Sequence, residues 1–84
     1  MAIRAALATT DPSNARWQRD LSFSFTKLAS TYEQQGERLR ALEHAERSLR
    51  IDERLAALDR SNVMWQRDER VRRAMVARLK AAGS

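Results

Sequence analysis

Asp11-Pro-Ser-Asn-Ala-Arg-Trp-Gln-Arg-Asp20 recurs 48 residues later in the chain as Asp59-Arg-Ser-Asn-Val-Met-Trp-Gln-Arg-Asp68. The shared tetrapeptide Trp-Gln-Arg-Asp at one register indicates an internal repeat. Because a repeat unit buries its apolar face against its neighbours, this echo predicts a chain of stacked, similar units. Upstream matches at the same offset pair Ile3, Leu7 and Ala8 with Ile51, Leu55 and Ala56.

Composition predicts an all-α fold. The 84 residues include two glycines and one proline, and Ala, Leu, Arg, Glu and Gln predominate. These are strong helix formers, whereas the β-branched residues that several strands require are scarce. We therefore expect a single domain over residues 1–84 with three to four antiparallel helices and one modest core.

Helix boundaries follow from local signals. Ser13 or Asn14 is the expected cap of a first helix, and Gly36 can take the left-handed conformation that stops it. Residues 59–62 form the next turn and cap. We expect one complete helix pair over 14–58, a capping helix over 62–82, and a preceding helix tail over 1–10.

Apolar spacing predicts which side of each helix is buried. The first helix presents Trp17, Leu21, Phe25, Leu28 and Tyr32 on one stripe. The inner face of the second is expected to use Leu39, Leu42, Ala45, Leu49, Leu55 and Leu58. The last helix has Val71, Met75 and Leu79 on one stripe.

Leu28-Ala29-x-x-Tyr32-x-x-x-Gly36, followed by Ala41-Leu42, Ala45 and Ser48-Leu49, resembles the tetratricopeptide repeat. The usual repeat has about 34 residues, so each helix here is longer. Glu53 stands where the family's closing proline is expected, which lets the second helix continue. The last helix is more polar than the first, as is typical of the terminal cap of a repeat array.

The resemblance implies a protein-interaction module whose partner lies along the first helix of each pair. Carried over to this chain, the implied partner-binding residues are Phe23, Thr26, Lys27, Ser30, Glu33 and Gln34. The family's clamp for a peptide carboxylate needs an asparagine pattern that is absent here. Phe23 has two open interpretations, a partner anchor or burial against a preceding helix.

No catalytic constellation stands out. The chain has no cysteine, and its single histidine, His44, lies between acidic residues that point around a helix. A surface or boundary position is the favoured interpretation of His44. We expect no enzyme activity, no metal and no cofactor.

The net charge of +5 is concentrated at the C-terminal end, where residues 63–84 carry +4. A basic patch of Arg67, Arg70, Arg72 and Arg73 could bind phosphates, but a solvated capping face is favoured. For the repeated Trp17 and Trp65, core packing is favoured over stacking on a ligand.

Three hypotheses for function follow. The leading one is a non-enzymatic module that binds a protein or peptide. The second is a self-association or capping unit of a repeat assembly. The third, a nucleic-acid binder, is less favoured, and no membrane contact is expected. Without a signal peptide or apolar span in the sequence, we expect a cytoplasmic protein. Arg outnumbers Lys fourteen to two, as is typical of GC-rich bacterial genomes.

Overall fold

The computed structural model describes residues 12–83, and it gives their side chains from residue 14 onward. Three helices follow one another: α2 (Pro12–Gln34), α3 (Arg38–Leu58) and α4 (Val63–Ala82). The described part of the chain contains no strand, so the all-α prediction is confirmed. The expected helix tail over residues 1–10 and the side chain of Ser13 lie outside what is described.

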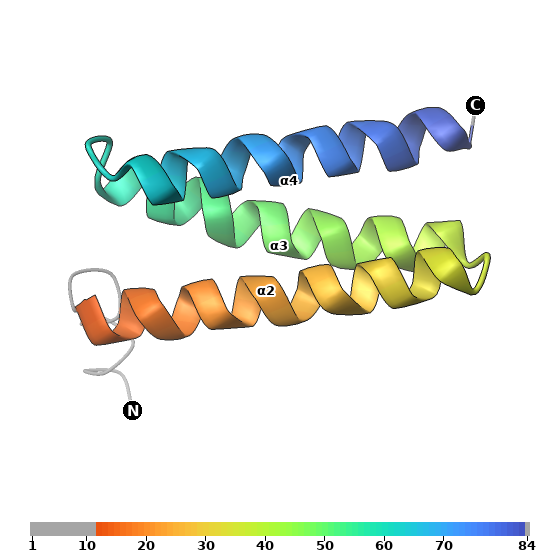
Figure 1. The fold of residues 1–84 in the computed structure, drawn as a ribbon, viewed down its shortest axis with the longest axis horizontal. Helices are drawn as coiled ribbons and strands as arrows, with labels where there is room; N and C mark the ends of the chain where they lie inside the picture. The colour runs from red at the N-terminus through yellow and green to blue at the C-terminus, as the bar shows by residue number, and fades with distance from the viewer. Residues whose placement is uncertain (1–11, 84) are drawn as a thin grey trace.

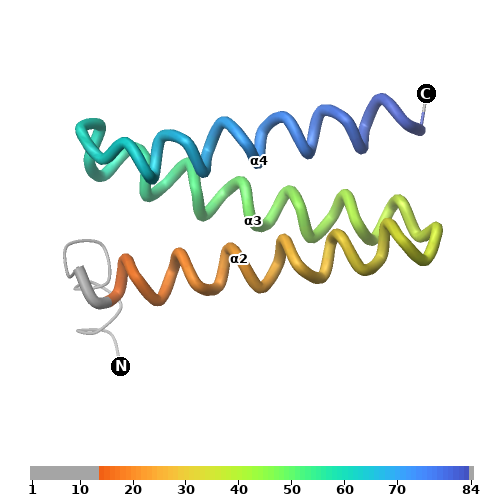
Figure 2. The backbone as a smooth tube through the Cα atoms, viewed as in Figure 1, coloured from red at the N-terminus to blue at the C-terminus, as the bar shows by residue number. Residues whose placement is uncertain are grey.

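The three helices run back and forth: in Figure 1, α2 and α4 run from left to right and α3 runs from right to left. Helix α3 packs against both of its neighbours, whereas the α2 and α4 backbones approach each other at few points. Figure 2 follows the same path, with α2 and α4 parallel to each other and α3 antiparallel to both. Side chains therefore make most of the contact between α2 and α4.

Both turns use the predicted chemistry. Gly36 has φ 79°, a left-handed conformation that costs other residues free energy. The Gly36 N–H donates to the carbonyl of Glu33, which ends α2. Asn62 caps α4, because its Oδ1 accepts the N–H of Trp65 at 3.0 Å. The predicted helix stop at Gly36 and the predicted cap before α4 are confirmed.

The core has two apolar clusters. In the first, Ala29, Ala41 and Ala45 are fully buried and pack with Val76 and Leu79. In the second, Ala15, Ile51 and Leu55 pack with the partly buried side chains of Leu21, Phe25 and Trp65. Alanine at the closest positions lets the helices approach, and larger side chains fill the space around them.

Several predicted core positions are wrong. Trp17, Leu39 and Leu58 are 59%, 71% and 50% exposed. Each lies two residues from a buried alanine, which places it about 200° around its helix and away from the contact face. The predicted Val71 stripe is also displaced, because α4 packs through Arg72, Val76 and Leu79 and leaves Val71 half exposed. Leu28 is likewise 44% exposed.

Candidate interaction surfaces

A buried polar network joins all three helices. Ser22 of α2 donates a 2.6 Å hydrogen bond to Oδ1 of Asp52 on α3, while Arg72 Nε of α4 donates to Oδ2 at 3.1 Å. The Ser48 hydroxyl lies 2.6 Å from the Ser22 hydroxyl and 2.9 Å from that of Thr26. In the described part of the chain, no buried side-chain nitrogen or oxygen lacks a hydrogen-bond partner.

This network is built for packing rather than for reaction. Burial raises the pKa of Asp52, and the hydrogen bonds from Ser22 and Arg72 oppose that rise. Asp52 is 1% exposed and both of its oxygens are occupied by donors from neighbouring helices. A substrate therefore has no access to this carboxylate. The network aligns the three helices.

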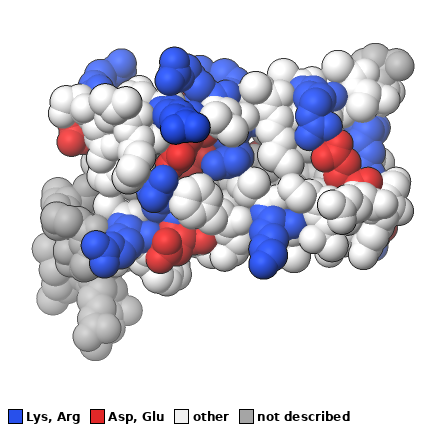
Figure 3. Space-filling view, viewed as in Figure 1, with Lys and Arg blue, Asp and Glu red and all other residues white. Residues whose placement is uncertain are grey.

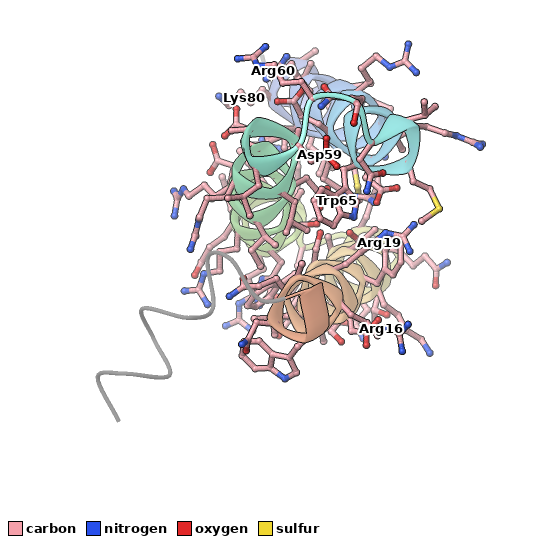
Figure 4. All side chains as sticks on the ribbon, turned by 90° about the vertical axis from the view of Figure 1, so that its left-hand side faces the viewer. Arg16, Arg19, Asp59, Arg60, Trp65 and Lys80 are labelled. Atoms are coloured by element: carbon pink, nitrogen blue, oxygen red, sulfur yellow. The ribbon has the colours of Figure 1, made fainter. Side chains whose placement is uncertain are left out.

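Ion pairs bridge the seam between α2 and α4. Arg19 Nε lies 2.7 Å from Asp68 Oδ2, and in Figure 4 Arg19 extends from α2 toward α4. Farther along, Arg78 donates to Glu33 through both terminal guanidinium nitrogens, with Nη2 3.1 Å from Oε1. Hydrogen bonding to Arg78 lowers the pKa of Glu33. Blue and red side chains meet along this seam in Figure 3.

The implied partner-binding residues of α2 separate into two sets. Thr26 is hydrogen-bonded inside the network, and Glu33 is held by Arg78. The other positions, Lys27, Ser30 and Gln34, are exposed.

Phe23, for which two interpretations were open, is 40% exposed. Its ring lies 4.6 Å from the guanidinium carbon of Arg19 and 5.9 Å from that of Arg72. Cation–π contacts of this kind hold an aromatic ring in place at a partly exposed site. The ring is thus fixed by its own chain on one side and open to solvent on the other.

The predicted basic patch is smaller than expected. Arg72 is 6% exposed and paired with Asp52, so its assignment to an exposed patch is wrong. The cause is the buried carboxylate of α3, which no spacing argument along α4 alone could reveal. Arg73 is exposed but pairs with Glu53 and Glu69, so Arg67 and Arg70 are the exposed members without an ion pair to a described residue.

A shallow groove of about 320 Å³ lies between α2 and α3; we call it the arginine groove. Leu21, Phe25 and Ile51 supply its apolar part, and none of the described residues that line it is acidic. Its remaining lining residues are Gln18, Arg47, Arg50 and Arg54.

The three arginines of this groove differ in their partners. Arg47 pairs with Glu43 at 3.0 Å and lies over the Phe25 ring. Arg50 and Arg54 form no ion pair with any described residue. Sequence reasoning missed this site, although the spacing of positions 47, 50 and 54 places all three on one side of α3.

His44 is half-buried beside the ring of Tyr32, with Nδ1 2.8 Å from the carbonyl of Arg40. Over residues 12–83, no three His, Asp or Glu side chains are grouped closely enough to hold a metal ion. None of α2, α3 and α4 combines the length and apolarity that crossing a membrane requires.

Comparisons of the chain with protein-family models, curated proteins and solved structures found no match. The surfaces of the three helices are therefore the basis for a functional proposal.

Proposed function

We propose that this chain is a non-enzymatic, tetratricopeptide-like interaction module of the cytoplasm that binds an acidic, partly apolar segment of a partner protein. The observation that carries the proposal is the arginine groove. Its apolar floor lies beside Arg47, Arg50 and Arg54, and no carboxylate from residues 14–83 lines it. Arg47 is paired with Glu43, whereas Arg50 and Arg54 have no ion-pair partner among the described residues.

The groove suits an amphipathic helix or an extended peptide. Leucine-like side chains of the partner would cover Leu21, Phe25 and Ile51, with burial contributing about 25 cal/mol per Å² of apolar surface. Carboxylates of the partner would meet Arg50 and Arg54, whose planar guanidinium groups bind carboxylates with two hydrogen bonds. Apolar burial supplies the affinity, and the arginines supply selectivity for an acidic partner.

Two further features support binding rather than catalysis. The buried carboxylate Asp52 is saturated by donors from its own chain. Charged groups at the seam between α2 and α4 are paired with each other, as at the partly buried Arg19 and Asp68. Neither place presents a free nucleophile beside a base.

The test is fluorescence anisotropy with a labelled amphipathic peptide that carries leucines on one face and glutamates on the other. The groove variant is Arg50→Glu/Arg54→Glu. Its matched control, Arg67→Glu/Arg70→Glu, makes the same charge change at exposed positions of α4. We expect the groove variant to bind at least about tenfold more weakly than the wild type. The control variant should bind like the wild type.

A lysine-substituted version of the peptide separates charge recognition from general stickiness. Equal binding of the acidic and basic peptides, or equal loss in both protein variants, contradicts the proposal. A labelled DNA duplex tests the nucleic-acid alternative in the same assay. Duplex binding that only Arg67→Glu/Arg70→Glu abolishes, without binding of the acidic peptide, would replace the proposed function with that alternative.

A further inference from the structure

An apolar stripe runs along the outer side of α2. It consists of Trp17, Ser24, Leu28 and Thr31, which we call the α2 stripe; spacings of 7, 4 and 3 residues place them on one side of a helix. Trp17 is 59% and Leu28 44% exposed, and the other two are also exposed. Two large apolar side chains, Trp17 and Leu28, thus lie about three helical turns apart on this side of α2 with the small side chain of Ser24 between them.

The internal repeat identifies what this stripe is equivalent to. At the 48-residue offset, its four positions correspond in order to Trp65, Arg72, Val76 and Leu79 of α4. Those residues form the face that α4 packs inward: the last three are at most 6% exposed, and Trp65 packs on the Ile51–Leu55 cluster. Figure 4 shows Trp65 directed between the helices. The α2 stripe is thus the counterpart of a face that α3 covers in the second repeat.

The stripe can be buried without leaving hydroxyl groups unpaired. Ser24 Oγ donates to the carbonyl of Asp20 at 3.1 Å, and Thr31 Oγ1 donates to that of Lys27 at 3.0 Å. Both hydroxyls bond within their own helix, so desolvation costs little. The stripe therefore behaves as an apolar surface along its whole length.

Surfaces of a second copy differ in how well they fit the stripe. Helix α3 of a second copy already packs against its own α2 and α4, so it is not available to cover the stripe. The outer side of α4 presents Arg67 and Arg70, which an apolar stripe cannot accommodate. The α2 stripe of a second copy is apolar, and when the two helices are antiparallel the charges beside one stripe lie opposite charges of the other sign. We propose that a second copy of this chain covers the α2 stripe, with the two α2 helices antiparallel about a two-fold axis.

Charge sets the direction of this pairing. Asp20 and Lys27 flank the stripe on the same side, and neither forms an ion pair with a described residue. An antiparallel pair centred between residues 23 and 24 places each Asp20 opposite the Lys27 of the other copy. A parallel pair about a two-fold axis would instead put these charges on opposite sides of the contact, where Asp20 and Lys27 of different copies cannot meet. The small Ser24 lies at the crossing, and Trp17 meets the turn that holds Leu28 and Thr31 of the second copy.

This inference goes beyond the proposed function, because it concerns a different side of α2 and a different partner. Leu21 lies at the border between the α2 stripe and the arginine groove. Peptide binding reports on the groove and molecular mass reports on the stripe, so the two proposals fail separately.

The experiment is sedimentation equilibrium of the full chain over a wide concentration range. We expect a reversible dimer. Trp17→Glu should weaken it more than about a hundredfold, because it removes the largest apolar side chain of the contact and places a charge against the Leu28 turn of the second copy. Val71→Glu is the matched control: it adds the same charge at a half-exposed apolar position of α4 and should leave dimerisation unchanged. Circular dichroism verifies that each variant is folded.

Charge swaps test the antiparallel arrangement. Asp20→Lys and Lys27→Asp should each weaken the dimer about tenfold, since each turns two attractive pairs into repulsive ones. The double variant Asp20→Lys/Lys27→Asp should restore it. A monomer at all concentrations overturns the proposal, whether residues 1–11 or another protein covers the stripe. A dimer that Trp17→Glu leaves intact, or a double swap that fails to restore affinity, overturns it as well.

Discussion

Asp52 of α3 and Arg72 of α4 form a buried ion pair, with 3.1 Å between Oδ2 and Nε and side chains that are 1% and 8% exposed. The other carboxylate oxygen accepts a hydrogen bond from Ser22, so α2 is tied to the same group. Removing two charges from water offsets most of their attraction. The pair therefore contributes less to net stability than to register: sliding one helix by a residue would leave a buried charge without its partner.

Removing the carboxylate alone should be strongly destabilising. Asp52→Leu leaves the Arg72 guanidinium buried and unpaired, and we expect a loss of about 3–5 kcal/mol in the free energy of unfolding. For a small domain that is a large part of the total stability. Urea unfolding followed by circular dichroism measures the loss.

Two companion variants test the cause. Glu53→Leu removes the neighbouring carboxylate, whose pair with Arg73 is exposed, and should cost under about 1 kcal/mol. Asp52→Leu/Arg72→Met replaces the whole buried pair with apolar groups and should recover most of the loss. A double variant no more stable than Asp52→Leu alone would refute this account of the pair.

Close packing of small residues leads to a second prediction. Ala45 is 0% exposed in the cluster where α3 meets its neighbours. Ala45→Leu forces the helices apart and should lower the free energy of unfolding by about 1–3 kcal/mol. Ala57→Leu, at an exposed position of the same helix, should change it by less than about 0.5 kcal/mol. Equal effects at both positions would mean that α3 does not pack as described.

Local signals in the sequence predicted where helices end, because they depend on one or two residues. Gly36 and Asn62 act through their own backbone and side chain, and both turns follow from them. Burial was harder to predict, because a side chain's exposure depends on which way the whole helix faces. A hydrophobicity pattern placed Leu39 inward and could not assign Asp52 to the core, whose burial requires Ser22 and Arg72 on other helices.

The residues of the candidate site were also predicted only in part from the sequence. The resemblance pointed to α2, and Lys27 and Phe23 are indeed at its surface. It could not reveal that Thr26 and Glu33 are engaged by neighbouring helices, since those contacts join positions 22 and 45 residues apart. The arginine groove was missed because its floor and its charges come from different helices, although the spacing of its arginines was visible.

The left-handed conformation of Gly36 leads to a third prediction. Gly36→Ala places a Cβ on a residue with φ 79° and should destabilise the fold by about 1–2 kcal/mol. Gly36→Asn should cost less, because asparagine tolerates this conformation better. Gln35→Ala, next to it and exposed, should be nearly neutral. Thermal unfolding ranks the three variants; an order in which Asn is worse than Ala would contradict the backbone explanation.

Acid should weaken the pairing between Glu33 and Arg78. Hydrogen bonding to Arg78 lowers the pKa of Glu33 below its ordinary value of 4.5. A lowered pKa in the folded state means that the pair's contribution is present above pH 4.5 and is lost as the pH falls through the folded-state pKa. We therefore expect Glu33→Gln to be less stable than the wild type near neutral pH and equal to it in acid. Since both side chains are partly exposed, salt should reduce the difference.

The comparison with Glu33→Gln is needed because Asp52 changes the stability with pH in the direction opposite to Glu33. Burial raises its pKa, so its protonation favours the folded state, and that contribution is lost as the pH rises through its folded-state pKa. Both proteins contain Asp52, so its effect cancels when their urea midpoints are subtracted at each pH. If the difference between the two urea midpoints stayed constant from neutral pH through the acid range, the ion pair of Glu33 with Arg78 would not be the source of the stabilisation.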